Sequence, residues 1–364
     1  MIAYSTFGTS SYSNIVTGLS NEPSFVPNVF LPYTEQMNFW QRLHNLIAWK
    51  TDELFLHFLH FPKQKRLYEK HFPHVRKSFD EQHKSVSLFL NSNYFVSSTV
   101  RPEMKNSIDI GGIHVEPAKP LPKDIQEFLD SATKGAILFS MGSIIQAVHW
   151  PIDKREALVK AFGKLEQKVL WKYENETLPN KPDNVMISPW IPQRDILAHP
   201  NVKLFMTHGG LLGTTEALVE GVPVLGIPVF GDQRMNLNLA TLRGYAKTIK
   251  FEELSEECLS KALNLILKDS KISSKAKKIS KIYTDRPMTP QQAVVYWVEY
   301  VIRHDGAPLL RSASLDLTYF EMHSFDVYAF LITTLSFFVL FVQKIVKFTC
   351  KKVLLEKNQK LKKN

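Results

Sequence analysis

The stretch that decides the fold is VKLFMTHGGLLGTTEALVEGVPVLGIPV, residues 202–229. Its first six and last seven residues are apolar runs with the length of a β-strand. Between them, a glycine-rich turn leads into a helix that we expect near residues 214–220. A strand, a helix and a second strand in so short a stretch predict a parallel β-α-β unit.

The same alternation continues on both sides of this stretch. In residues 151–167, for example, Leu158, Phe162 and Leu165 fall on one face of a helix. Repeated units of this kind favour an α/β fold with a doubly wound parallel sheet. The further strands that we expect are residues 135–140, 168–173, 184–188 and 246–251, and the further helices begin near Pro151, Asp232, Ser255 and Thr289, the second ending near Gly244. Residues 1–110 are less regular: residues 37–49 and 54–61 indicate helices, but we expect no complete second sheet there.

The C-terminal end has the composition of a membrane span. Residues 325–346 read FDVYAFLITTLSFFVLFVQKIV, and their only charges, Asp326 and Lys344, lie near the two ends. A helix of this length reaches about 33 Å, which is enough for a hydrocarbon core of about 30 Å. The alternative, a buried core helix, usually shows a polar stripe that this segment lacks.

The positive charge of the chain belongs to its tail. The net charge is +10, but residues 344–364 alone hold eight Lys and one Glu, so the body is nearly neutral and offers no basic face for nucleic acid. Lysines follow the span, whereas residues 305–326 before it carry four acids and one Arg. The positive-inside rule therefore predicts a cytosolic tail and a lumenal or extracellular body.

The sequences of both ends of the chain give information about its location in the cell. Lys360 and Lys362 stand at the distances from the carboxyl end that are typical of a di-lysine retrieval signal of endoplasmic reticulum membrane proteins; a basic tail near anionic lipids is the alternative. Residues 1–10 lack the features of a signal peptide, so we expect a further segment upstream. The two cysteines, Cys258 and Cys350, would face different compartments and form no disulfide.

Polar side chains follow three of the expected strands. His208 and the glycines after it stand where a helix N-terminus binds phosphate, and Glu216 can accept from ribose hydroxyls; an ordinary tight turn is the alternative. Trp190 can stack on a base, although a core position is the commoner fate of tryptophan. Asp232 and Gln233 suit sugar hydroxyls, although Asp232 can also serve as a helix N-cap.

These motifs resemble one known family. The stretch WIPQRDILAHPNVKLFMTHGGLLGTTEALVEGVPVLGIPVFGDQRMNLNLA, together with IGGIHVEPAKPLPKDIQEFLD and ILFSMGS upstream, resembles the UDP-glycosyltransferases of animal detoxification, and HGGLLGTTEA is similar to insect members. The resemblance implies a GT-B fold, in which two Rossmann-like domains enclose the active site and the C-terminal one binds the nucleotide sugar without a metal or other cofactor.

The resemblance also implies roles for particular residues. Trp190 would stack on uracil, Gln193 would hold the nucleoside, and Glu216 would bind the ribose. Ser143, His208 and the backbone of Gly210 and Gly213 would meet the diphosphate, Asp232 and Gln233 would face the transferred sugar, and Asn236 would support them.

One departure from the family concerns the catalytic base. The family's base is a histidine near the start of the N-terminal domain, and this sequence is expected to begin beyond it. None of the six histidines in residues 1–110 lies in the base motif, so we assign no catalytic residue; they are His44, His57, His60, His71, His74 and His83. The resulting division is residues 1–110, the remnant of an acceptor-binding domain; 111–285, the UDP-sugar-binding domain; 286–324, a returning helix and juxtamembrane segment; 325–346, the span; and 347–364, the tail.

Three functional hypotheses follow. The first is a UDP-glycosyltransferase, truncated as it stands, that transfers a hexose with inversion to small lipophilic acceptors; UDP-glucose is the first choice of donor and UDP-glucuronate the second. The second hypothesis is a non-catalytic, membrane-anchored subunit that binds UDP-sugar and is completed by a partner. The third is a single-span receptor or scaffold, against which the polar residues at the strand ends argue. Whether the protein forms a homo- or hetero-oligomer stays open.

Overall fold

The computed structural model describes residues 1–361, and the side chains of residues 1–352. The chain divides into two units, Met1–Arg311 and a second that begins at Ser312. The first unit holds two parallel sheets, and the second is helical.

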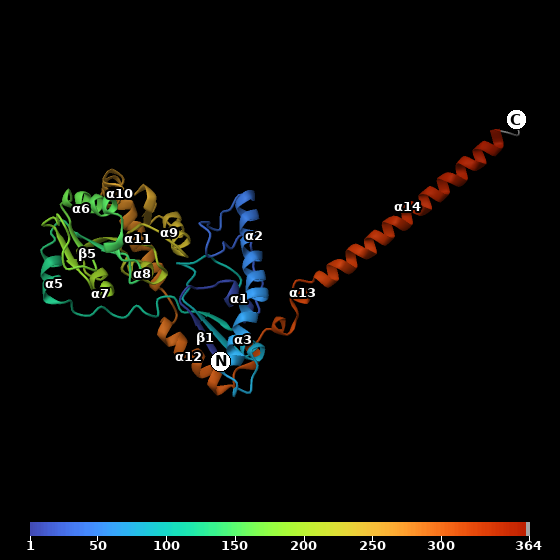
Figure 1. The fold of residues 1–364 in the computed structure, drawn as a ribbon, viewed down its shortest axis with the longest axis horizontal. Helices are drawn as coiled ribbons and strands as arrows, with labels where there is room; N and C mark the ends of the chain where they lie inside the picture. Colours follow the sequence, from blue (N-terminus) through green and yellow to red (C-terminus); the bar gives the residue numbers. More distant parts are fainter. Residues whose placement is uncertain (362–364) are drawn as a thin grey trace. The chain divides into compact units, whose positions relative to one another are not determined.

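A six-stranded parallel sheet, at the left of Figure 1, forms the core of the larger part of the first unit. Its strand order, β6-β5-β4-β7-β8-β9, reverses direction at β4, so the sheet is doubly wound as predicted. The strands are β4 (Ala136–Ser140), β5 (Lys168–Lys172), β6 (Val185–Ser188), β7 (Val202–Thr207), β8 (Val224–Gly226) and β9 (Ala246–Thr248).

Helices cover both faces of this sheet, because successive side chains of each strand point to opposite faces (Figure 1). In β4, Ile137 and Phe139 pack with α6 and α10, whereas Ala136 and Leu138 pack with α5, α7, α8, α9 and α11. The helices are α5 (Lys123–Asp130), α6 (Ile152–Gly163), α7 (Gln193–Leu197), α8 (Leu211–Glu220), α9 (Gln233–Leu242), α10 (Glu256–Lys268) and α11 (Ser270–Thr284). Short 3₁₀ turns lie at Ala147–His149, Phe251–Glu253, Pro308–Leu310 and Ala313–Asp316.

The N-terminal part contains a second, smaller sheet that the sequence analysis did not predict. Its three parallel strands are in the order β1-β2-β3. The helices expected near residues 37–49 and 54–61 are present as one continuous segment that includes a π-helical turn. The elements are β1 (Ile2–Ser5), α1 (Ser11–Thr17), α2 (Phe39–Phe55), the π turn Leu56–His60, α3 (Phe61–His71), α4 (Phe79–Lys84), β2 (Leu88–Asn91) and β3 (Ser107–Asp109).

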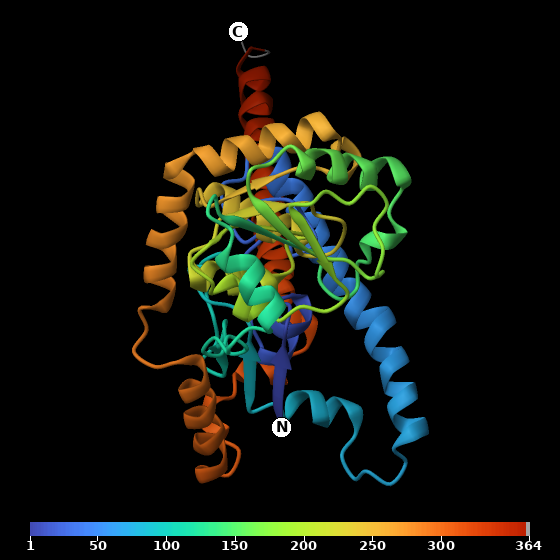
Figure 2. The ribbon, with the colours of Figure 1, turned by 90° about the vertical axis from the view of Figure 1, so that its left-hand side faces the viewer.

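Helix α12 (Pro290–Arg303) returns from the larger sheet to the smaller one (Figure 2). It begins at the predicted capping box, in which the Thr289 hydroxyl accepts from the Gln292 amide at 3.1 Å. Its Val301 packs against Leu88 and Leu90 of β2. The N-terminal strands are therefore covered by a helix from the far end of the unit.

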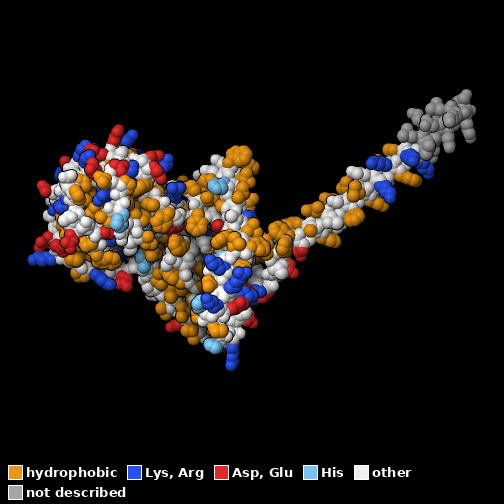
Figure 3. Space-filling model, viewed as in Figure 1, with side chains coloured by type: hydrophobic (Ala, Val, Ile, Leu, Met, Phe, Trp, Pro, Cys, Tyr) orange, Lys and Arg blue, Asp and Glu red, His pale blue; other side chains and the backbone are white. Residues whose placement is uncertain are grey.

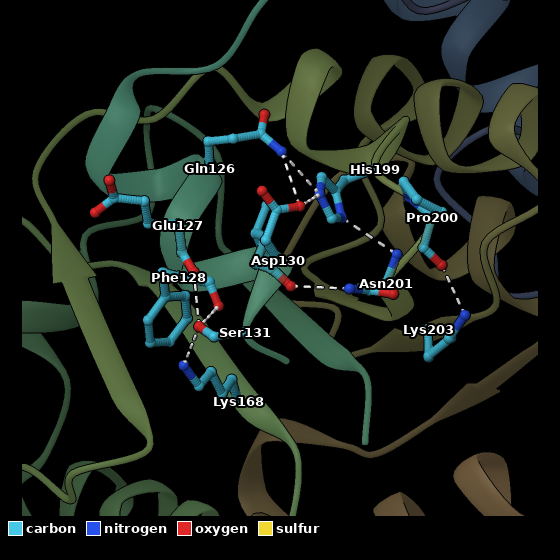
Figure 4. A network of polar contacts seen from close by, with 11 residues as sticks. Gln126, Glu127, Phe128, Asp130, Ser131, Lys168, His199, Pro200, Asn201 and Lys203 are labelled. Carbon is cyan, nitrogen blue, oxygen red and sulfur yellow. Dashed lines mark hydrogen bonds and ion pairs between the residues drawn. The ribbon is translucent and has the colours of Figure 1, made fainter. Parts of the chain in front are cut away.

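The amino end of β7 is closed by a polar network (Figure 4). His199 Nε2 lies 3.1 Å from Asp130 Oδ1 and 3.2 Å from Gln126 Nε2 of α5, while the Asn201 amide donates to His199 Nδ1 at 3.2 Å. These bonds fix α5 to the strand. They lie at the opposite end of β7 from the glycine-rich turn, so we interpret them as structural.

The unit that begins at Ser312 is dominated by one long helix. It contains α13 (Tyr319–Met322) and α14 (Phe325–Leu361). Within α14, the segment Phe325–Lys352 contains an 18-residue stretch with a mean hydropathy of 2.1 and no buried part, and Figure 3 shows hydrophobic side chains along the helix. By length and composition it can cross a membrane. The helix continues beyond residue 346, so the expected boundary between span and tail is not a change of secondary structure; Lys362 lies outside the described residues.

Candidate functional site: a trough at the carboxyl edge of the larger sheet

The turns that follow β4, β6, β7 and β8 meet at one edge of the sheet, because parallel strands end on the same side. Two hollows of about 340 and 370 Å³ lie there. They share four lining residues, Gly142, Ser143, Gln193 and Glu216. We call the two together the trough: its first hollow lies at Trp190 and its second at Asp232.

The first hollow has an exposed tryptophan at its rim. Trp190 is 73% exposed, so it is not the core tryptophan that was the alternative. Its carbonyl accepts a hydrogen bond of 2.7 Å from the Ser188 hydroxyl, and the next residue, Ile191, is buried. The backbone on both sides of the indole is thereby held. Lys172 lines the same hollow and pairs with Glu174 at 3.1 Å.

The two hollows meet at a bonded pair of side chains. Gln193 Nε2 donates to Glu216 Oε2 at 2.7 Å. Burial raises the pKa of Glu216, and the bond from Gln193 and the charge of Arg194 oppose that rise. Gln193 begins α7, and Glu216 is the sixth residue of α8. The pair leaves Glu216 Oε1 as the carboxylate oxygen that Gln193 does not use.

His208 stands between two glycines. A Cβ at Gly142 would lie 2.8 Å from His208 Cε1, and a Cβ at Gly210 would lie 2.6 Å from His208 Nε2. The ring therefore fits because neither neighbour has a side chain. Thr207 Oγ1 lies 3.4 Å from His208 Nδ1. Burial lowers the pKa of His208 to about 4, so the imidazole is neutral near pH 7 and its N–H can donate to an anion.

The glycine-rich turn places the start of α8 directly at the trough. The helix begins at Leu211, three residues earlier than predicted, and Gly210 is its N-cap residue. Gly209 has a φ of +88°, and a Cβ there would lie 2.4 Å from Leu237 Cγ. No other residue type fits that position without strain. The free N–H groups of the first turn of α8 are thus available to a ligand at the trough.

Asp232 and Gln233, at the start of α9, line the second hollow. Asp232 makes no side-chain cap bond; its Oδ2 accepts from Asn236 Nδ2 at 2.8 Å, and burial raises the pKa of its carboxyl. The same Asn236 nitrogen donates to the Gly209 carbonyl at 3.1 Å. Gln233 Oε1 accepts from the amide of Phe230 at 3.0 Å, which leaves its nitrogen free for a ligand.

The structure brings the predicted site residues together. Nine of them line the trough, and Asn236 lies behind it, joined to Asp232; the nine are Ser143, Trp190, Gln193, His208, Gly210, Gly213, Glu216, Asp232 and Gln233. The trough also has lining residues that were not predicted, among them Thr6, Phe7, Gly142, Ile144, Lys172, Arg194, Asp195, Leu212 and Phe230. Gly142 could have been predicted from the sequence, because it follows a strand and stands next to Ser143. Thr6 and Phe7 could not, because only the tertiary structure brings them to the trough.

The six histidines of residues 1–110 do not line the trough. His57, His60 and His83 instead belong to an aromatic cluster with Tyr12 and Phe61. In the described part of the chain, no three His, Cys, Asp or Glu side chains are grouped as metal ligands are.

Comparison with known sequences identifies the family. Residues 2–361 match the family described as UDP-glucoronosyl and UDP-glucosyl transferase. This chain belongs to the UDP-glycosyltransferase family. The membership confirms the resemblance of its motifs, makes it a relative of transferases and argues against the receptor hypothesis.

Two relatives in the UDP-glycosyltransferase family come from Dactylopius coccus. UDP-glycosyltransferase UGT5 is 39% identical over 326 residues, which cover 89% of this chain and 62% of the relative. UDP-glucosyltransferase 2 is 35% identical over 354 residues, which cover 95% of this chain and 68% of the relative. The chain thus spans about two thirds of the length of these relatives.

A solved glycosyltransferase confirms the fold. VinC, crystallised in complex with DTDP, superposes with a TM-score of 0.54 at 21% identity, covering 74% of this chain and 66% of VinC. With its parallel sheets and helices on both faces, the UDP-glycosyltransferase chain therefore has the predicted GT-B type of α/β architecture.

Proposed function

We propose that the protein binds a UDP-sugar in the trough and transfers its hexose, with inversion, to a hydroxyl group of a small lipophilic acceptor, with no catalytic base assigned among the described residues. The observation that carries the proposal is the order of side chains along the trough. Trp190 lines only the first hollow, the Gln193–Glu216 pair lines both, and His208 and Asp232 line only the second.

That order matches the chemical order of a UDP-sugar. An exposed indole suits stacking on a planar base. The Glu216 carboxylate suits the ribose hydroxyls, and His208 with the first turn of α8 suits the diphosphate. Asp232 then meets the hydroxyls of the sugar. Ser143 and the backbone of Gly210 and Gly213 complete the diphosphate part of the proposed site.

The second hollow, which Asp232 lines, suits a neutral hexose such as glucose better than a hexuronate. No Lys or Arg is among the described residues that line the second hollow, and His208 is neutral near pH 7. A hexuronate carboxylate would lie near Asp232 without a cation to pair with it, which is unfavourable. The name of one relative, UDP-glucosyltransferase 2, agrees with glucose, although the family description includes both sugars.

An apolar rim supports a lipophilic acceptor. Phe7, Ile144 and Phe230 all line the second hollow and are 64%, 82% and 51% exposed. Exposed apolar side chains grouped around a polar end favour an apolar ligand that carries one hydroxyl group. Phe7 belongs to the N-terminal part, so both parts of the first unit contribute to this rim.

The proposed location is the membrane of the endoplasmic reticulum, with a lumenal body and a cytosolic tail. Its support is α14, which is long and apolar enough to span a bilayer, and the lysines that follow residue 343.

A second candidate is a UDP-sugar-binding subunit that a partner completes. It is favoured by the lining of the second hollow, in which His208 is the one histidine among the described residues. The low pKa of His208 makes it a poor base near pH 7. In this candidate the base would come from the partner.

A donor competition experiment tests the proposal. The full chain, in detergent, is incubated with a panel of phenols and with UDP-glucose or UDP-glucuronate, while binding of each donor is measured in parallel. Transfer from UDP-glucose supports the enzyme. Binding without transfer supports the subunit, and binding of neither donor contradicts both.

A further inference from the structure

The loop between β5 and β6 is buried where it leaves the sheet and exposed in its middle. Tyr173, directly after β5, is buried, and its amide donates to the Ser188 carbonyl of β6 at 2.9 Å. Later in the loop, Leu178 is buried in the same hydrophobic core as Tyr173. The three residues 175–177 between these anchors are all exposed. The fold therefore holds this short stretch at the surface.

The exposed stretch has the sequence of an acceptor for an N-linked glycan. It reads Asn175-Glu176-Thr177, and such acceptors have the form Asn-X-Ser/Thr with X other than proline. It is the only triplet of this form in the 364 residues of the chain. A glycan is large and hydrophilic, so its asparagine has to lie at the surface, which is the position of Asn175.

The structure does not use the side chains of this triplet. At the other end of the same loop, the Asn184 amide nitrogen donates to the carbonyls of Phe162 and Gln167, both at 2.9 Å, so that asparagine is needed by the fold. The Asn175 amide and the Thr177 hydroxyl, in contrast, make no hydrogen bond within residues 1–352. Modification of Asn175 therefore breaks no contact of the folded chain.

The triplet also leaves the trough intact. Residues 175–177 line neither hollow. The residue before them, Glu174, is fixed by its ion pair with Lys172 at 3.1 Å and by a hydrogen bond of 3.3 Å from the Val148 amide. A glycan on the next residue therefore displaces none of the described side chains that line the trough.

We propose that Asn175 carries one N-linked glycan. In that step Nδ2 of Asn175 forms a bond to the anomeric carbon of an oligosaccharide. The bond from that carbon to the lipid diphosphate that carried the oligosaccharide breaks, and the amide releases one proton. The hydroxyl that the acceptor form requires is that of Thr177. The inference rests on the lumenal body of the proposed function, because this transfer takes place on the lumenal side of the membrane.

Removal of the glycan tests the inference. The full chain is made in the presence of sealed microsomes, and protease then digests everything outside them, so that only lumenal bodies remain. We expect peptide-N-glycosidase to shift the protected body by one step in electrophoresis. Asn175→Gln and Thr177→Ala should lack the shift, and Thr177→Ser should keep it. Asn180→Gln is the matched control, since Asn180 is exposed in the same loop but starts no such triplet, and it should shift like the wild type.

The outcomes separate the glycan from the orientation of the chain. A protected body that does not shift, or a shift that persists in Asn175→Gln, overturns the inference and leaves the proposed location standing. A wild-type body that the protease digests overturns the proposed location, and the inference with it.

Discussion

The imidazole of His208 occupies the space that a Cβ atom at Gly210 would need. The distance from that Cβ to His208 Nε2 would be 2.6 Å, which is shorter than a van der Waals contact. Gly210 has a φ of −62°, so alanine is acceptable to the backbone there and the ring alone forbids it. Glycine is therefore needed at this position to make room for the His208 ring, and not because of the backbone conformation.

Substitution of Gly210 tests this relationship. We expect Gly210→Ala to turn the His208 ring away and to weaken UDP-glucose binding about tenfold or more, because a hydrogen bond to the diphosphate is lost. The melting temperature should change little. Gly163→Ala, at the end of α6, is the control. Unchanged affinity in calorimetry, with Gly210→Ala folded, would show that His208 does not contact the ligand.

The pH dependence of stability tests the burial of His208. Its pKa is about 4 in the folded chain and about 6.5 when unfolded. The unfolded state therefore takes up a proton first, so the contribution of this group to stability is complete above about pH 6.5 and is lost as the pH falls toward 4. The loss is on the order of 3 kcal/mol.

We expect His208→Gln to lack this contribution. Between pH 7.5 and pH 4.5, the melting temperature of the wild type should fall more steeply than that of the variant, and the two curves should run parallel above pH 7. Parallel curves over the whole range would mean that the imidazole is hydrated in the folded protein.

Trp190 and Trp40 form a matched pair, since each is 73% exposed and only Trp190 lines the trough. We expect Trp190→Ala to cost about 1–3 kcal/mol of UDP binding through lost stacking on the base. Trp40→Ala should cost nothing measurable, and Trp190→Phe should retain part of the affinity. If the two alanine variants bind UDP equally, Trp190 does not contact the base.

Asp232 is expected to contribute to the sugar and not to the nucleotide. Asp232→Asn should weaken UDP-glucose by about 1.5–3 kcal/mol, the contribution of hydrogen bonds to a charged group, and leave UDP nearly unchanged. The loss of its negative charge should also reduce the preference for UDP-glucose over UDP-glucuronate. Equal losses for UDP and UDP-glucose would place Asp232 at the diphosphate instead.

The orientation of the protein in the membrane can be tested separately. With the body lumenal, protease added to sealed microsomes should remove a tag fused to the C-terminus and leave the body intact. The reason is the asymmetry of lysines around Phe325–Lys352. Digestion of the body with protection of the tag would reverse the orientation.

Much of the larger sheet could be predicted from the sequence, because its buried strands are continuous apolar runs separated by turns. The smaller sheet could not. Its strands β1, β2 and β3 have only three or four residues each, too few for a pattern to emerge, and β1 pairs with a strand more than 80 residues away. Helix α11 was missed because its five lysines and four serines conceal the few residues that it buries.

The site residues can also be divided into those that the sequence could predict and those that it could not. His208, Glu216 and Asp232 follow strands in the sequence, and the parallel order of the strands brings them to one edge. The bonds from Asn236 to Gly209 and from Gln193 to Glu216 join residues more than 20 positions apart. No local pattern encodes such contacts.

The central claim is that the trough is specific for a uridine nucleotide. Calorimetric titration of the full chain with UDP and with ADP, under identical conditions, tests it most directly. We predict clear binding of UDP, at least about tenfold tighter than that of ADP, with the difference reduced in Trp190→Ala. Equal affinity for the two nucleotides, or binding of neither, would contradict the account.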